Sequence, residues 1–118
     1  MKSIKSLAFI AYPVSDIKKS TAWYRDVMGF VPGEMASEHW VEFETGGVAF
    51  GIGRGEDLDL TPGSACSVAF EMSDLDGAVA ALKAKGVEMT KVMDMPSCRA
   101  TFVKDPDGNR IALHQRKA

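Results

Sequence analysis

Three side chains in the second half of the sequence have the chemistry to act on another molecule or to hold it. Glu71 interrupts an otherwise apolar run, His114 lies near the end of the last apolar run, and Cys98 begins the run before it. An imidazole and a carboxylate can exchange protons near neutral pH, and a thiolate can attack an electrophile. Glu71 and His114 are therefore the candidate catalytic residues, and all three are candidate ligand-binding residues.

Each of these residues also has an ordinary structural interpretation. His114 would be a half-exposed histidine at a strand end, and Glu71 would form an ion pair with Arg110 on a neighbouring strand. Cys98 would be a small buried hydrophobic residue, as free cysteines often are. Strand alternation turns Arg99, the cation that could activate the Cys98 thiol, to the other side of the strand. For Cys98 we therefore favour the structural interpretation.

The elements that must position these residues occur twice in the sequence. Residues 10–17 read IAYPVSDI, and residues 68–75 read VAFEMSDL. A repeat of about half the chain indicates one duplicated unit. We predict a single domain over residues 1–118, made of two repeats at about 4–54 and 64–116 and joined by an acidic linker at about 55–63.

Each repeat predicts one strand, one helix and three further strands. In the first repeat we expect a strand at 6–12, a helix over 17–28, and strands at 31–36, 39–45 and 48–53. In the second we expect a strand at 65–72, a helix over 75–85, and strands at 87–92, 98–104 and 110–115. A Ser-Asp pair precedes each helix as an N-cap, and a glycine, Gly29 or Gly86, ends it.

Composition excludes several classes of partner. The chain has 118 residues and a formal net charge of −2, and its lysines and arginines form no large cluster, so we expect no nucleic-acid and no membrane partner. We see neither a secretion signal nor an apolar segment of membrane-spanning length. Cys66 and Cys98 have no metal-binding or disulfide spacing, which indicates a reducing, cytoplasmic location.

Two motifs add a family resemblance to this pattern. Residues 24–30 read YRDVMGF after a Val-Ser-Asp start, and residues 105–109 read DPDGN before the final strand. With the repeated unit, they make the chain resemble the vicinal oxygen chelate superfamily, which includes glyoxalase I, extradiol dioxygenases, and fosfomycin- and bleomycin-resistance proteins. The resemblance implies an α+β fold: two tandem βαβββ units with curved mixed sheets that enclose a cleft. It also implies a homodimer.

The same resemblance shows where a metal would be bound. In metal-dependent members, His and Glu ligands come from the first and last strands of each unit. Counted from the Ser-Asp pairs and the DPDGN turn, those positions hold Phe9, Gly51, Ser67 and Ala112. Three of these side chains have no donor atom and the serine hydroxyl is a poor ligand, so we expect no metal and no cofactor. A displaced site built from Glu71 and His114 is the alternative.

Strand alternation selects the residues that would line the cleft. It places Phe9 and Ala11 on one face, and it places Glu71 and His114 on the concave face with Ser67 and Ala112. Aromatic residues of the first repeat would add an apolar surface. The predicted ligand-binding residues are Phe9, Trp40, Phe50, Gly51, Ser67, Glu71, Cys98, Ala112 and His114.

These observations favour a protein of the bleomycin-resistance type that binds a small, largely apolar or aromatic molecule without metal. The alternative is a glyoxalase-like lyase or isomerase that uses Glu71 and His114 as acid and base, or a displaced metal. Metal-dependent glyoxalase I activity is not expected, because no Lewis acid would stabilise the enediolate. A third interpretation is a scaffold or regulatory module that keeps the fold without the chemistry.

Overall fold

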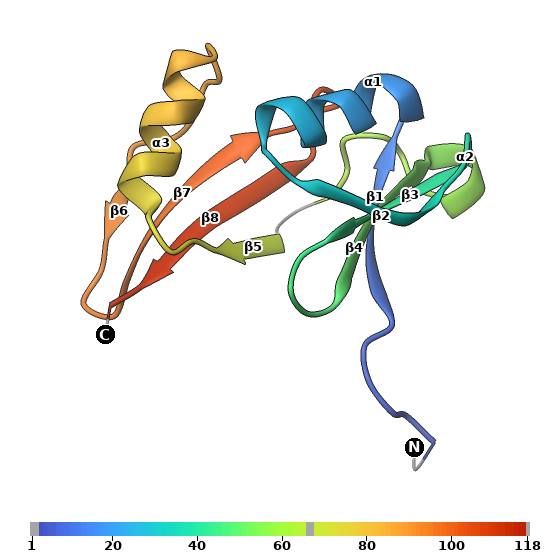
Figure 1. The fold of residues 1–118 in the computed structure, drawn as a ribbon, viewed down its shortest axis with the longest axis horizontal. Coiled ribbons are helices and arrows are strands. Elements are labelled where there is room, and N and C mark those ends of the chain that lie inside the picture. Colours follow the sequence, from blue (N-terminus) through green and yellow to red (C-terminus); the bar gives the residue numbers. More distant parts are fainter. Residues whose placement is uncertain (1–2, 66–67, 118) are drawn as a thin grey trace. The chain divides into compact units, whose positions relative to one another are not determined.

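The computed structural model, which describes residues 3–65 and 68–117, contains two compact units that meet at the Pro62–Gly63 bond (Figure 1). Each unit has one open four-stranded mixed sheet and at least one helix. The fold is therefore α+β with two βαβββ units, as predicted. The cleft that we expect between the sheets remains a prediction. None of the described helices is long and apolar enough to cross a membrane.

Unit 1 (residues up to Pro62) holds the first sheet. Its elements are β1 (Phe9–Val14), α1 (Ile17–Ala22), the π-helical turn η1 (Trp23–Val27), β2 (Val31–Ala36), β3 (Trp40–Glu44), β4 (Ala49–Arg54) and α2 (Gly55–Leu58). The sheet order is β1-β4-β3-β2. Strand β1 runs parallel to β4, and the other pairs are antiparallel.

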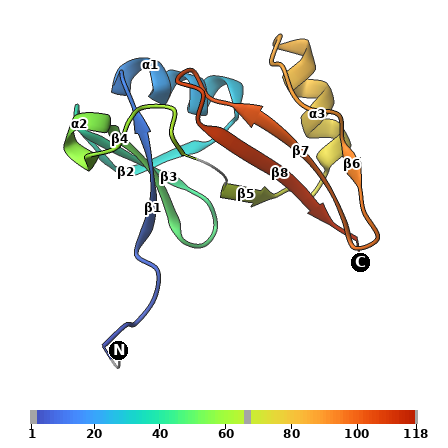
Figure 2. The same ribbon diagram turned by 180° about the vertical axis from the view of Figure 1, so that it is seen from behind.

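Unit 2 (residues from Gly63) repeats the strand-helix-strand-strand-strand order, and its helix is α-helical throughout (Figure 2). Its elements are β5 (Val68–Glu71), α3 (Leu75–Ala84), β6 (Met93–Asp94), β7 (Cys98–Lys104) and β8 (Arg110–Arg116). The sheet order β5-β8-β7-β6 matches that of unit 1. Strand β5 is parallel to β8, and β7 is antiparallel to both of its neighbours.

The predicted helix boundaries are confirmed in both units. The Asp16 carboxylate accepts the Lys19 N–H at 3.1 Å, and the equivalent Asp74 carboxylate accepts the Gly77 N–H at 3.0 Å. Each bond satisfies a donor that a helix start leaves unpaired. Gly29 and Gly86 follow the two helices with φ of 75° and 77°, a left-handed conformation that favours glycine.

One helix differs in type from the expectation, and three other expected elements were wrong. The first helix is α-helical only to Ala22 and then widens, with the Met28 N–H donating to the Trp23 carbonyl at 3.2 Å. The predicted strand at 87–92 is reduced to one isolated bridge between Met89 and Val103, and the short β6 follows it; beside the bridge the Phe102 N–H donates to the Thr90 hydroxyl at 3.0 Å. Helix α2 lies within the expected linker. Strand β1 begins at Phe9, later than expected.

Each sheet buries one face under its helix. In unit 1 the core is an aromatic cluster in which Tyr24 of η1 lies 5.4 Å from Phe50 and 5.6 Å from Phe43, measured between ring centroids. In unit 2 Leu75 of α3 is buried together with Ile111 and Leu113 of β8. We call the opposite side of each sheet its far face. Because side chains alternate along a strand, the residues between these core positions lie on the far faces.

A buried turn fixes the register of β7 against β8. The Asp105 carboxylate accepts the Asn109 backbone N–H at 2.8 Å and the Asn109 side-chain amide at 2.8 Å, and both residues are buried. Asn109 also accepts the Ala65 N–H at 3.0 Å. The resulting register places Ala100 opposite His114 and Phe102 opposite Ala112, which sets the composition of the far face.

Candidate functional site

The far face of unit 1 carries a pair of aromatic rings. Phe9 on β1 and Trp40 on β3 meet edge to face, with ring centroids 5.2 Å apart and an interplanar angle of 70°. Phe9 is 52% exposed although it is a large apolar residue. We call Phe9 and Trp40 the aromatic pair.

Two glycines on β4 make room for the aromatic pair. A Cβ on Gly51 would overlap the indole of Trp40, and a Cβ on Gly53 would lie 3.1 Å from both the Trp40 ring and the Leu58 side chain. The indole therefore lies directly on the β4 backbone. Its Nε1–H donates to the Glu42 carboxylate at 2.9 Å, which gives this polar atom a partner on the same strand.

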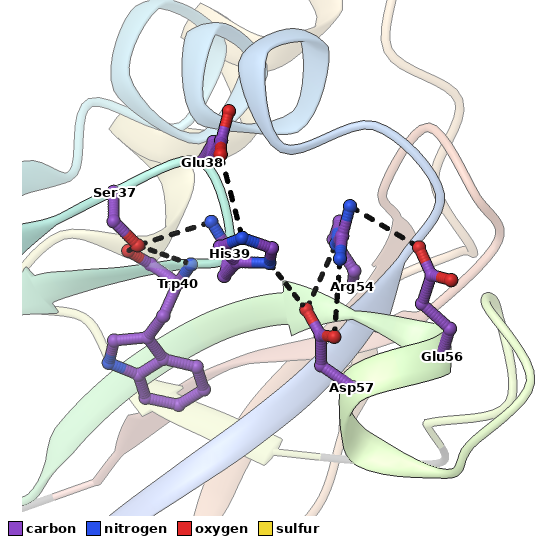
Figure 3. A network of polar contacts seen from close by, with 7 residues as sticks. All are labelled: Ser37, Glu38, His39, Trp40, Arg54, Glu56 and Asp57. Atoms are coloured by element: carbon purple, nitrogen blue, oxygen red, sulfur yellow. Dashed lines mark hydrogen bonds and ion pairs between the residues drawn. The ribbon is translucent and has the colours of Figure 1, made fainter.

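A polar network holds the turn before Trp40 (Figure 3). The Ser37 hydroxyl accepts the N–H groups of His39 and Trp40 at 3.1 and 3.2 Å. His39 Nδ1 lies 3.0 Å from Asp57 on α2, and Arg54 Nε donates to the same carboxylate oxygen at 2.9 Å. The hydrogen bonds from Arg54 and then from His39 lower the pKa of Asp57 to about 2. The network thus ties the turn to the end of β4.

The far face of unit 2 carries a hydrogen-bonded carboxylate and imidazole. Glu71 on β5 lies opposite His114 on β8, and Glu71 Oε1 is 2.5 Å from His114 Nδ1. The second carboxylate oxygen accepts the backbone N–H of Arg116 at 2.7 Å. These two bonds lower the pKa of Glu71 below its ordinary value of 4.5, and the bond from the Arg116 N–H has the larger effect. Glu71 is therefore an ionised acceptor at neutral pH.

The ionised carboxylate decides which nitrogen of His114 carries a proton. Because Glu71 can only accept, Nδ1 must donate to it, and a neutral imidazole then has its lone pair on Nε2. Among the described residues, no hydrogen-bond partner occupies Nε2. The His114 side chain is 28% exposed. The pair can consequently accept a proton from a bound molecule at Nε2, or donate one after protonation.

Alanines lie near His114 on the same face of the sheet. Ala69 lies opposite Ala112 across the β5–β8 pair, and Ala100 lies opposite His114 across the β7–β8 pair. Alternation puts these three alanines, which we call the alanine floor, on the far face. Arg110 lies over the Phe102 ring at 3.9 Å from its centroid and marks the edge of this surface.

The ion pair that we considered between Glu71 and Arg110 is replaced by the contact of Glu71 with His114 and of Arg110 with Phe102. Arg99 points to the helix side, as alternation predicts, and its guanidinium donates to Asp76 at 2.8 Å. Cys98 is a partly exposed free thiol opposite Arg116.

Other predicted residues lie in different surroundings. Phe50 is 1% exposed within the aromatic core, on the side of the sheet facing α1, so we do not include it in the proposed site. Gly51 and Ala112 are buried on the far faces of their units. Ser67, like Cys66, lies outside the described residues.

Sequence reasoning missed the network of His39, Arg54 and Asp57. The pair His39–Asp57 joins residues 18 positions apart, and the acidic stretch that contains Asp57 is typical of a linker. The backbone N–H of Arg116 was missed for another reason: its contact with Glu71 depends on how far β8 extends past His114, and no side-chain pattern carries that information.

These two βαβββ units, each with an open mixed sheet and a helix on one face, place the chain in the class of α+β proteins built from two tandem βαβββ units. The chain belongs to the Glyoxalase/Bleomycin resistance protein/Dioxygenase superfamily, whose family model matches residues 6–113. No curated protein matches the chain.

Several solved structures share this fold. The antibiotic binding protein TnmS3 from Streptomyces sp. CB03234 is 26% identical, with a TM-score of 0.84 and 98% of each chain covered. A glyoxalase/bleomycin resistance protein from the same organism is 28% identical, with a TM-score of 0.80, 93% of this chain and 100% of the other covered. A lactoylglutathione lyase from Agrobacterium tumefaciens is 16% identical over 96% and 95% of the chains with a TM-score of 0.78, which shows the fold alone.

The described residues do not fit the metal site that the superfamily implies. Phe9, Gly51 and Ala112 offer no side-chain donor at the positions where its metal-dependent members have ligands. Within residues 3–65 and 68–117, no three histidine, cysteine, aspartate or glutamate side chains come close enough to share an ion.

Proposed function

We propose that this protein binds a small, largely apolar or aromatic molecule without the help of a metal ion. The observation that carries the proposal is the aromatic pair, which packs on Gly51 at positions where metal-dependent relatives hold ligands. A half-exposed phenylalanine beside an indole offers a ring surface for stacking, and binding sites for small molecules are commonly built this way.

Two further observations support a binding role. Glycine is required at Gly51 by the indole above it, so the backbone and the ring are adapted to each other. One structural relative, TnmS3, is an antibiotic binding protein at 26% identity. The proposal for this chain extends that likeness to a ligand of aromatic or apolar character.

The test is a ligand screen read by thermal shift and by tryptophan fluorescence. The chain has two tryptophans, so a Trp23→Phe background leaves Trp40 as the single reporter. A true ligand raises the melting temperature and changes Trp40 emission. Phe9→Ala should weaken its binding about tenfold, in line with the loss of one ring contact, while the exposed Leu60→Ala serves as control. A ligand that binds Phe9→Ala as tightly as it binds the unchanged protein would refute the assignment of the site.

Elemental analysis tests the absence of metal chemistry. Protein purified without an affinity metal or chelator should contain far less than one equivalent of zinc, nickel, iron or manganese per chain. A value near one equivalent would contradict the proposal and point to a displaced site that includes Glu71 and His114.

We also propose that the protein is a cytoplasmic homodimer. Strand β1 and strand β5 are edges of their sheets, and exposed edges favour pairing with another strand. Light scattering coupled to size-exclusion chromatography should give twice the chain mass of 12.7 kDa. A mass of one chain at micromolar concentration would refute the dimer.

A second candidate function is a glyoxalase-like lyase or isomerase. The observation that favours it is the 2.5 Å contact between Glu71 and His114, which leaves Nε2 as an available base. His114 would remove a proton from carbon beside a carbonyl, and Glu71 would stabilise the imidazolium that forms. Turnover of the hemithioacetal of methylglyoxal and glutathione, lost in both Glu71→Gln and His114→Gln, would establish it; turnover that survives His114→Gln would exclude it.

A further inference from the structure

The far face of unit 1 places two carboxylates beside the aromatic pair. Glu42 and Glu44 alternate with the buried Val41 and Phe43 along β3, so both side chains lie on the far face. Glu42 Oε2 accepts the Trp40 Nε1–H at 2.9 Å. Glu42 is therefore in direct contact with the indole, and Glu44 lies two residues further along the same strand.

The strand register brings Glu44 near Phe9. Phe43 lies opposite Phe50 in the β3–β4 pair, which puts Glu44 opposite Ala49. Ala49 in turn lies opposite Phe9 in the β4–β1 pair. Because neighbouring strands lie about 4.8 Å apart, the backbones of Glu44 and Phe9 are about 10 Å apart. The small side chain of Ala49 leaves room above the sheet between them for a bound molecule.

This part of the far face is open. Phe9 is 52% exposed, and Val31, which lies opposite Glu44 on β2, is 61% exposed. Glu44 is also exposed, and no hydrogen bond or ion pair within the described part of the chain engages its carboxylate. A ring surface and a carboxylate without a partner there are thus accessible side by side.

The charge of this face is negative. The far-face positions of β1, β3 and β4 hold the two glutamates and no lysine or arginine, as far as the described residues go. The described lysines and arginines of unit 1 lie elsewhere: Lys5 before β1, Lys18 and Lys19 on α1, Arg25 on η1, and Arg54, which pairs with Asp57. A ligand on this face therefore meets two negative charges and no positive one from these three strands.

Aromatic rings and carboxylates together favour a cation. An ammonium group is attracted to the faces of the Phe9 and Trp40 rings, and it forms a charge-assisted hydrogen bond with a carboxylate. An anion is repelled by both glutamates, and a neutral hydroxyl gains only an ordinary hydrogen bond. Glu42 and Glu44 consequently distinguish aromatic molecules by their charge.

We propose that the far face of unit 1 binds an aromatic molecule that carries a protonated amine, with the ring against Phe9 and Trp40 and the ammonium paired with Glu44. This inference rests on the proposed function and specifies the charge of its ligand. The aromatic pair accounts for affinity toward rings in general, whereas Glu42 and Glu44 account for the selection of rings that carry a cation.

The test compares two probes with the same ring and the same linker, 2-naphthylmethylamine and 2-naphthylmethanol. At low ionic strength the unchanged protein should bind the amine about fivefold more tightly, as expected for a partly exposed ion pair with a cation–π contact. Glu44→Gln should lower this affinity ratio, and Glu42→Gln with Glu44→Gln should bring it to about 1. Asp26→Asn is the matched control, because it removes a carboxylate from η1, on the other side of the sheet, and should leave the ratio unchanged.

The outcomes separate this inference from the proposed function. If both probes bind equally to the unchanged protein, or if the preference survives the double substitution, selection by charge is refuted while aromatic binding stands. If neither probe binds, both are refuted.

Two measurements without changes to the glutamates cover the case of a misfolded variant. Added salt should weaken binding of the amine, because it screens the carboxylates, and should not weaken binding of the alcohol. In the Trp23→Phe background both probes should change the emission of Trp40. A preference for the amine that is insensitive to salt, or binding that leaves Trp40 emission unchanged, would overturn the inference.

Discussion

The two units share one topology but present different far faces. In unit 1 the far face carries the aromatic pair on a glycine backbone, and the indole nitrogen pairs within the unit. In unit 2 it carries small alanines beside Glu71 and His114, with Nε2 left for a partner among the described residues. The features that both units keep are those that start and stop the helices, Asp16 with Gly29 and Asp74 with Gly86.

Two units of one topology can therefore keep the same backbone arrangement while one surface differs. Caps and left-handed glycines set chain direction, and a loss there costs stability whatever the ligand. Exposed far-face side chains do not pack under a helix, so their replacement costs less, whereas the glycines beneath Trp40 are constrained by the indole. The following experiments test this contrast by measuring the stability of variants in each unit.

The largest effect is expected from Gly51→Val. The new side chain would occupy the space of the Trp40 indole, which would have to leave the sheet or force the strands apart. Overpacking of this kind costs about 1–3 kcal/mol, and the free energy of unfolding measured in denaturant should fall by that amount. Gly47→Ala is the matched control, because a Cβ there meets nothing within 4 Å. Equal stability of the two variants would refute the packing of Trp40 on β4.

Equal effects are expected from the two N-caps. Asp16→Ala and Asp74→Ala each remove one carboxylate that accepts a backbone N–H at about 3 Å. Each should lower the free energy of unfolding by about 1 kcal/mol. Asp16→Asn and Asp74→Asn are the controls, because the asparagine side-chain oxygen can still accept the same backbone N–H and the stability should be retained. A loss of stability in only one of the two alanine variants would show that the Ser-Asp pair does not have the same role in both units.

Acid should weaken unit 2 through Glu71. Its pKa is lowered in the folded chain from 4.5, so the carboxylate stabilises the fold above pH 4.5, and this stabilisation is lost as the pH falls through the folded pKa. Unfolding free energies measured at a series of pH values should show a smaller acid dependence for Glu71→Gln. An unchanged pH profile in that variant would contradict the geometry around Arg116.

Acid should also weaken unit 1 through Asp57. Its pKa falls from 3.8 to about 2 in the fold, so its stabilisation is complete above pH 3.8 and is lost as the pH falls through 2. Because its side chain is 37% exposed, solvent screens the interaction and the change should be modest. Asp57→Asn should remove the acid dependence between pH 4 and 2 only. A change in the free energy of unfolding near neutral pH would show that the network of His39, Arg54 and Asp57 has a different role.

The sequence predicted the parts of the fold that rest on local signals. Ser-Asp pairs and glycines at helix ends have direct physical causes, and alternation correctly put Glu71 and His114 on one face, where the structure shows them hydrogen-bonded. Their ligand-binding roles remain predictions.

The rest depends on interactions that no local pattern carries. The network of His39 with Asp57 requires a turn and a short helix to come together. Next to the bridge of Met89 with Val103, the hydroxyls of Thr90 and Thr101 take part in the hydrogen bonds between the two segments, and no alternation of apolar residues predicts such side-chain bonds. The burial of Phe50 follows from its register opposite Phe43 on β3, where the side chain faces the core.

The π-helical turn accounts for a difference in length between the helical segments of the two units. The stretch from Asp16 to Gly29 is one residue longer than that from Asp74 to Gly86. A turn that closes from Trp23 to Met28 holds one more residue than an α-helical turn. Unit 1 thus keeps the same start and the same stop as unit 2, and the wider turn accommodates the extra residue between them.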